Sequence, residues 1–144
     1  MTYVTAATTA TFLTGDYRID ALQSDQKWGG GIGASAVLTY SFHTNGVSTY
    51  DPTEKTMSPV AYNNLGELSD SAKAAVRMAL GEWSKVANIS FVEVADAGEY
   101  SGVLRFGTSD YAGKVAPTGL AYTPNLYLSN AGDVWLSTYF SGNR

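Results

Sequence analysis

An amphipathic helical pattern between Leu68 and Asn88 constrains the fold of this chain more than any other stretch. Apolar residues recur there at steps of three and four, which places them on one face of a helix. They are Ala72, Ala75, Val76, Ala79, Leu80, Trp83 and Val86. Ser69 is suited to cap the first turn, and Asn88 can take the left-handed conformation that ends a helix. The sequence therefore predicts a helix over residues 69–86.

Two runs rich in β-branched and aromatic residues flank this helix. Ala36–Phe42 comes before it and Ile89–Val94 follows it, and both have the composition of strands. A strand, a helix and a strand in this order form a crossover unit, whose strands pair in parallel. The predicted fold class is therefore α+β or α/β with a mostly parallel sheet.

Three further strands are predicted after this unit. Gly102–Gly107 is short and apolar enough for a buried strand, and Gly132–Ser137 is expected to be the last strand. Gly119–Thr123 lies between two prolines, which lack the N–H that an interior strand needs. This third run is therefore expected at the edge of the sheet.

The first 35 residues are expected to form an N-terminal segment in front of a domain at residues 36–144. Residues 1–13 carry no regular pattern, whereas Gly15–Leu22 can hold a short helix that docks through Ile19 and Leu22. The glycine run at residues 29–33 precedes a strand, so it indicates a turn and not a dinucleotide-binding loop.

Composition excludes several classes of protein. A chain of 144 residues is sufficient for one domain. With 9 basic and 13 acidic residues it has a net charge of -4 and no basic cluster, so neither nucleic acid nor an anionic membrane is an expected partner. The absence of cysteine excludes disulfides and thiolate sites. No apolar run is long enough to span a membrane, and the N-terminus lacks the features of a signal peptide.

The sequence contains no complete catalytic motif among those searched for. The single histidine, His43, is interpreted as a surface or hydrogen-bonded residue, and neither a nucleophile elbow nor a His-Glu-x-x-His motif occurs. Paired carboxylates or a calcium turn are open alternatives, although all these acids fall in predicted loops where solvated acids are expected. The pairs are Asp16 with Asp20, Asp51 with Glu54, and Asp96 with Glu99. The long polar connection at residues 43–66 has a length typical of binding loops.

Six segments, in this order, resemble the N-terminal half of the catalytic domain of serralysin-type metalloproteases, which belong to the metzincin clan. Together they cover roughly residues 14–137. They are Gly15–Leu22 with Trp28, Leu38–Phe42, Ala72–Val94 with its Trp83-Ser-Lys-Val-Ala-Asn-Ile-Ser-Phe-Val-Glu-Val ending, Leu104–Gly107, Ala121–Pro124 and Gly132–Trp135.

The resemblance implies a twisted sheet of four parallel strands and one antiparallel edge strand, packed on two helices, of which residues 69–86 would be the first. In this family an extended substrate adds to the edge strand through main-chain hydrogen bonds. The matching substrate-binding positions here are Gly119, Leu120, Ala121 and Tyr122.

The zinc-binding helix of the family has no counterpart in these 144 residues. It carries His-Glu-x-x-His-x-x-Gly-x-x-His, and one histidine cannot supply three imidazole ligands. No catalytic or metal-binding residue is therefore predicted here, although zinc and calcium are expected in a complete, secreted family member.

Without that helix, apolar sheet surface is expected near Trp135 and Leu136. The expected partners are an extended peptide and either a second chain that bears the zinc helix or another copy of this chain. The alternative to a protease part is a non-catalytic module that binds peptides or proteins on the same scaffold.

Overall fold

The computed structural model describes residues 7–45, 65–97, 101–110, 119–125 and 128–138. The elements within these ranges are β1 (Thr8–Ala10), α1 (Tyr17–Asp20), β2 (Gln26–Trp28), β3 (Ala36–Phe42), α2 (Asp70–Val86), β4 (Ile89–Glu93), β5 (Leu104–Ser109), β6 (Gly119–Ala121) and β7 (Val134–Ser137). In this part of the chain, no helix has both the length and the apolar character to cross a membrane.

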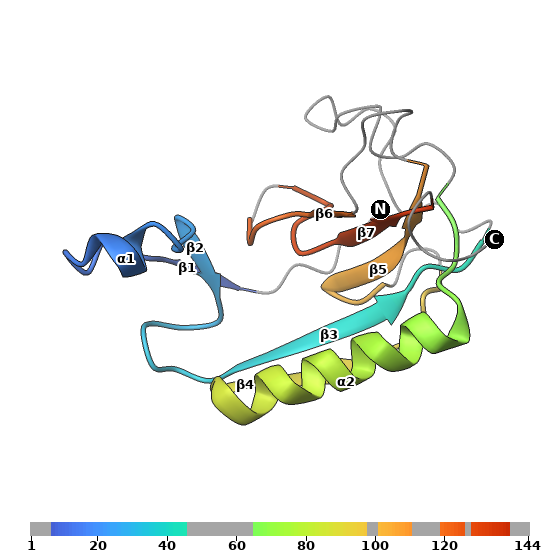
Figure 1. Ribbon diagram of the computed structural model, residues 1–144. Coiled ribbons are helices and arrows are strands. Elements are labelled where there is room, and N and C mark those ends of the chain that lie inside the picture. Colours follow the sequence, from blue (N-terminus) through green and yellow to red (C-terminus); the bar gives the residue numbers. More distant parts are fainter. Residues whose placement is uncertain (1–6, 46–64, 98–100, 111–118, 126–127, 139–144) are drawn as a thin grey trace.

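A five-stranded sheet with the order β4-β3-β5-β7-β6 forms the centre of the fold (Figure 1). The first four strands of that order are parallel, and β6 pairs antiparallel with β7 at the edge. The predicted α+β fold, with a mostly parallel sheet and an antiparallel edge strand, is therefore confirmed.

The long helix α2 runs along β3 and β4 and begins where the sequence predicts. The Ser69 hydroxyl accepts a hydrogen bond from the Ala72 N–H at 3.3 Å, which caps the first turn. The predicted end of the helix, a left-handed Asn88, is not what the structure shows. Ala87 becomes extended and ends the helix, while the Asn88 side chain donates to the Gly33 carbonyl at 3.1 Å.

The hydrophobic core lies between α2 and one face of the sheet. Its buried members are Tyr40, Phe42 and Leu68, and the rings of Tyr40 and Phe42 meet edge to face at 5.7 Å. Half-buried apolar residues from α2, β4, β5 and β7 pack around them. These are Ala72, Val76, Leu80, Phe91, Leu104, Phe106 and Leu136.

Only part of the predicted apolar helix face contributes to this core. Ala75, Ala79 and Val86 are exposed, and they form what we call the uncovered flank of α2. Arg77 binds Glu93 of β4 on the other side of the helix, about 180° away at 100° per residue. The uncovered flank therefore points away from β4, towards the side of the sheet that carries β5 and β7.

The opposite face of the sheet is polar and partly covered by its own chain. The Gly102 N–H donates to the Ser41 hydroxyl at 2.9 Å, and the Val103 N–H donates to the Thr39 hydroxyl at 3.1 Å. Trp135 lies on this face and is 1% exposed, so the expectation of exposed sheet surface at this residue is wrong. Val37 and Val92 are instead apolar residues left open on this face, at 67% and 47% exposed.

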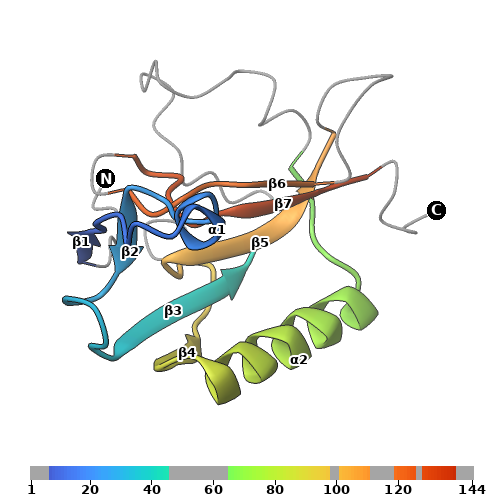
Figure 2. The same ribbon diagram turned by 60° about the vertical axis from the view of Figure 1, so that its left-hand side comes forward.

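Residues 7–35 form an N-terminal arm beside the sheet (Figure 2). β1 pairs antiparallel with β2, which corrects the prediction of an irregular segment over residues 1–13. The predicted short helix is present as α1, but its docking is wrong, because Ile19 and Leu22 are 49% and 88% exposed. The helix is held by its own turn, where Asp16 accepts from the Arg18 N–H.

Candidate functional site

The outer edge of the sheet brings together the four residues predicted to bind substrate. Gly119, Leu120 and Ala121 form β6, and Tyr122 follows directly. Leu120 lies opposite Trp135, and the Tyr122 N–H donates to the Asp133 carbonyl at 3.0 Å. Since the hydrogen-bonding direction alternates along an antiparallel strand, Leu120 and Tyr122 bond inward to β7.

The same alternation directs the N–H and C=O groups of Gly119 and Ala121 away from β7. Both residues are exposed. An edge strand with outward donors and acceptors can take an additional strand by main-chain hydrogen bonding. Of the four predicted residues, these two therefore have outward backbone groups, and the other two hold the edge in place.

A bulge between Tyr122 and β7 fixes the end of this edge. The Gly132 N–H donates to the Tyr122 carbonyl at 3.2 Å, while the Tyr122 N–H bonds to the next residue, Asp133. Gly132 and Asp133 thus both lie opposite Tyr122, which defines a β-bulge. Gly132 has a φ of 88°, the left-handed conformation that the first residue of such a bulge requires. The Asp133 N–H also closes a turn on the Asn130 carbonyl at 3.0 Å.

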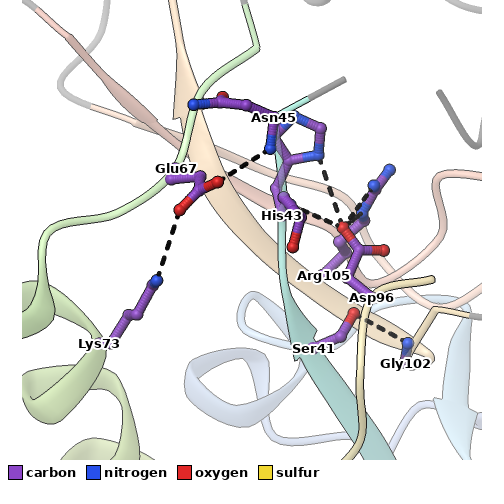
Figure 3. A network of polar contacts seen from close by, with 9 residues as sticks. Ser41, His43, Asn45, Glu67, Lys73, Asp96, Gly102 and Arg105 are labelled. Atoms are coloured by element: carbon purple, nitrogen blue, oxygen red, sulfur yellow. Dashed lines mark hydrogen bonds and ion pairs between the residues drawn. The ribbon is translucent and has the colours of Figure 1, made fainter. Parts of the chain in front are cut away.

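A buried polar network lies where β3 ends, between β3, β5 and the residues after β4 (Figure 3). Arg105 of β5 donates to Asp96 Oδ2 from Nη2 at 2.7 Å and from Nε at 3.2 Å. The same oxygen accepts the Thr44 N–H at 2.9 Å. The Arg105 and Asp96 side chains are 2% and 0% exposed, so this is a buried, hydrogen-bonded ion pair.

His43 belongs to this network but does not hydrogen-bond to its carboxylate. Its Nδ1 atom lies 3.7 Å from Asp96 Oδ2, and its side chain is 3% exposed. Burial lowers the pKa of His43, and the nearby Arg105 cation lowers it further, whereas Asp96 and Glu67 raise it. Because Arg105 already neutralises Asp96, burial prevails and His43 is neutral at pH 7.

Trp135 connects the network to the edge. Its ring meets His43 edge to face at 5.6 Å, and the Arg105 guanidinium carbon lies 6.0 Å from the ring centre. Gly107 makes room for it, since a Cβ atom there would lie 2.4 Å from the Trp135 ring. The network thus positions β7, and β7 positions β6.

A second set of contacts continues the network towards α2. Glu67 accepts the Asn45 N–H at 3.0 Å and lies 3.7 Å from the Lys73 ammonium (Figure 3). Both pairs are more exposed than Arg105 with Asp96, and they tie the residues after β3 to the start of α2.

Sequence reasoning missed the network. The interpretation of His43 as a surface residue is wrong, because its side chain is 3% exposed, and its buried Nδ1 has no hydrogen bond. The expectation that Asp96 is solvated is also wrong. An arginine within the apolar run Gly102–Gly107 was the available signal, because a charge in a buried strand needs a buried partner.

Asp16 and Asp20, the other described members of the predicted acidic pairs, have local roles. Asp16 pairs with Arg18 at 2.7 Å, and Asp20 accepts from the Thr14 N–H at 2.7 Å. Asp51, Glu54, Glu99 and most of the predicted binding loop, residues 46–64, lie outside the described residues.

Among the residues that the structure describes, no three histidine or acidic side chains come together in a way that could hold a metal ion. Comparison of the sequence with protein-family models and with curated proteins finds no match. The fold and the edge strand are therefore the observations on which a function can be argued.

Proposed function

We propose that residues 36–144 are the N-terminal part of a secreted, serralysin-like zinc metalloendopeptidase. They supply the scaffold and the edge strand that aligns an extended peptide for hydrolysis. The one histidine of the chain is buried beside an ion pair and cannot supply the three imidazole ligands of the family's zinc site. Zinc, the general base and structural calcium belong to a complete enzyme and would come from other residues.

The exposed antiparallel edge strand is the observation that carries this proposal. β6 occupies the position in the sheet that the resemblance assigns to the substrate-binding strand. Gly119 and Ala121 direct their backbone groups outward, so a peptide can pair with them without disturbing β7.

The uncovered flank of α2 supports the same proposal. It points to the side of the sheet where Leu104, Phe106, Val134 and Leu136 are half-buried. A second helix packed beside α2 would cover both surfaces, and the resemblance assigns the zinc helix to the same catalytic domain.

A comparison of two products tests the proposal. The purified 144-residue chain is expected to leave casein intact, whereas the product of the reading frame extended beyond Arg144 is expected to cleave it until a chelator is added. Chelator-resistant cleavage by the 144-residue chain alone would contradict the proposal. An extended frame without the zinc motif would do so as well.

The second candidate is a non-catalytic module that binds peptides or proteins through β6. The same exposed edge favours it, because strand addition requires no metal. A stop codon directly after Arg144, with no gene nearby that encodes the zinc helix, would favour this candidate over a protease part.

A further inference from the structure

A pocket of about 370 Å³ lies at the other end of the sheet, where β3 and β4 begin. Trp28 of the arm, Trp83 of α2 and Phe91 of β4 give it aromatic walls, and Ala36 and Ile89 line its base. The volume is within the range of roughly 300–1,000 Å³ typical of small-ligand sites. It can hold a ring system the size of naphthalene.

Trp83 opens this pocket to solvent. The residue is 63% exposed, although its position on α2 belongs to the apolar face that packs on the sheet further along. The neighbouring Ala87 and Asn88, which also line the pocket, are exposed. A flat aromatic ligand could therefore enter from this side and stack on an indole ring already in place.

The charge of the pocket comes from Lys27, the one charged residue among those that line it. Its ammonium donates to the carbonyls of Trp28, Gly30 and Gly31 at 3.0, 2.5 and 3.3 Å. These carbonyls are neutral, and within the described residues Lys27 has no ion pair. The positive charge of this lining residue is therefore not neutralised, and because all three N–H donors are in use, it attracts an anion through charge alone.

The end of α2 acts in the opposite direction but is weaker. A helix C-terminus carries about half a negative charge. One of its carbonyls, that of Trp83, already accepts the Ala87 N–H at 2.9 Å. The unit charge of Lys27 outweighs this partial charge, so the pocket favours an anionic group over a cationic one.

We propose that this pocket binds an aromatic carboxylate, with the ring between Trp28 and Trp83 and the carboxylate beside Lys27. The site shares no residue with the β6 edge, and the proposal does not depend on the protease assignment. A free aryl acid and a peptide that ends in an aromatic residue present the same chemistry.

Titration of the full 144-residue chain with 1-naphthoate, followed by amide NMR, tests the assignment. We expect saturable binding with a Kd on the order of 0.1–1 mM, and shifts at Ala34, Ala87 and Asn88. N-acetyltryptophan represents the peptide terminus, and the tighter of the two ligands identifies the source. Saturable shifts confined to other residues would overturn the proposal, as would no binding of either acid.

Variants of Trp83 test the aromatic part of the site. Trp83→Ala should weaken naphthoate binding at least about 10-fold, and Trp83→Phe, which keeps a ring, should lie within about 3-fold of wild type. The matched control Met78→Ala removes an exposed apolar residue of α2 outside the pocket and should change nothing. Wild-type affinity in Trp83→Ala would overturn the proposal.

The uncharged analogue 1-naphthalenemethanol tests the role of Lys27. It should bind at least about 5-fold more weakly than naphthoate to the wild-type chain, and this difference should disappear in Lys27→Gln. Equal binding of the alcohol and the acid to the wild-type chain would overturn the carboxylate assignment.

Discussion

At the scale of single residues, the Arg105–Asp96 pair is the central interaction of the buried polar network. Both side chains are buried, and Asp96 Oδ2 accepts three hydrogen bonds. Removal of Arg105 leaves the Asp96 carboxylate buried without its cation. The network therefore depends on the presence of Arg105.

We expect Arg105→Met to lower the free energy of unfolding by about 3–5 kcal/mol, measured by urea denaturation. The double variant with Asp96→Leu should recover part of this loss, because no charge remains unpaired. Arg18→Met is the control, since its pair with Asp16 is exposed to solvent and its loss should change stability far less. Equal losses in the two single variants would argue against a buried pair.

His43 should titrate below its ordinary pKa of about 6.5. Because the folded state lowers this pKa, the unfolded chain takes up the proton first as the pH falls. The free energy of unfolding should therefore decrease as the pH drops below about 6.5, and His43→Leu should remove this dependence above pH ~5. The Cε1–H NMR signal of the chain's one histidine gives the midpoint directly. A midpoint at or above the ordinary value would contradict the prediction.

Gly132 is required both by its backbone angle and by its surroundings. Its φ is 88°, and a Cβ atom would lie 2.7 Å from Leu104 Cδ2 and 3.1 Å from the Val103 carbonyl oxygen. Gly15 has a φ of 87° but nothing within 4 Å of the same position. The two positions therefore separate backbone strain from steric overlap.

Gly15→Ala should cost about 1–2 kcal/mol in the free energy of unfolding, from the left-handed backbone alone. Gly132→Ala should cost roughly 1–3 kcal/mol more, because the added methyl group overpacks the end of β7. Thermal unfolding of both variants measures the difference. Similar losses would show that the neighbours of Gly132 relax.

At the scale of the elements, neighbouring residues of β6 have different roles, so peptide binding and fold stability can be tested separately. Ala121 directs its N–H outward, whereas Leu120 pairs with Trp135 of β7. Proline removes an N–H at either position, but only at Leu120 does this break the sheet.

Ala121→Pro should lower stability by less than about 1 kcal/mol and abolish binding of fluorescein-labelled casein peptides, measured by anisotropy. Leu120→Pro, the matched variant, should lower stability by a larger amount. Undiminished peptide binding by a folded Ala121→Pro variant would exclude strand addition at this edge.

Patterns within the sequence predicted the elements well where the pattern is local. β3 was predicted with its observed bounds and α2 to within one residue, since strand composition and helical periodicity are contained in the segments themselves. β1 was missed, because its three residues, two half-buried and one exposed, carry no apolar alternation. Periodicity also shows which apolar residues share a side of α2. It cannot show how many of them the sheet is wide enough to cover.

The candidate site was predictable only in part for the same reason. Prolines around Gly119–Thr123 placed this strand at the edge, which needs no knowledge of the neighbours. The burial of Asp96 depends on Arg105, which the folded sheet brings beside it. A loop acid and its buried partner cannot be matched from either segment alone.

At the scale of the whole molecule, the fold leaves two apolar surfaces beside each other. They are the uncovered flank of α2 and the half-buried apolar residues of β5 and β7. The uncovered flank of α2 faces the side of β5 and β7, and no described element packs over it. Such surfaces usually become buried by another helix or another copy.

The isolated chain should therefore self-associate, with a sedimentation coefficient that rises with concentration. The double variant Ala79→Glu with Val86→Glu should sediment as a monomer, whereas Met78→Glu, on the side of α2 opposite the core stripe, should behave as wild type. A monodisperse wild-type monomer without affinity for a hydrophobic dye would contradict this prediction.

The position of β3 in the sheet also affects how the chain folds during synthesis. β3 pairs with β4 on one side and with β5 on the other, yet it leaves the ribosome well before either of them. Until the chain has emerged from the ribosome as far as Ser109, the backbone groups of β3 remain available to other nascent chains, and such long-range parallel pairing is slow. Chaperone demand and aggregation during expression should therefore originate from this strand, although it becomes one of the best-protected parts of the finished molecule.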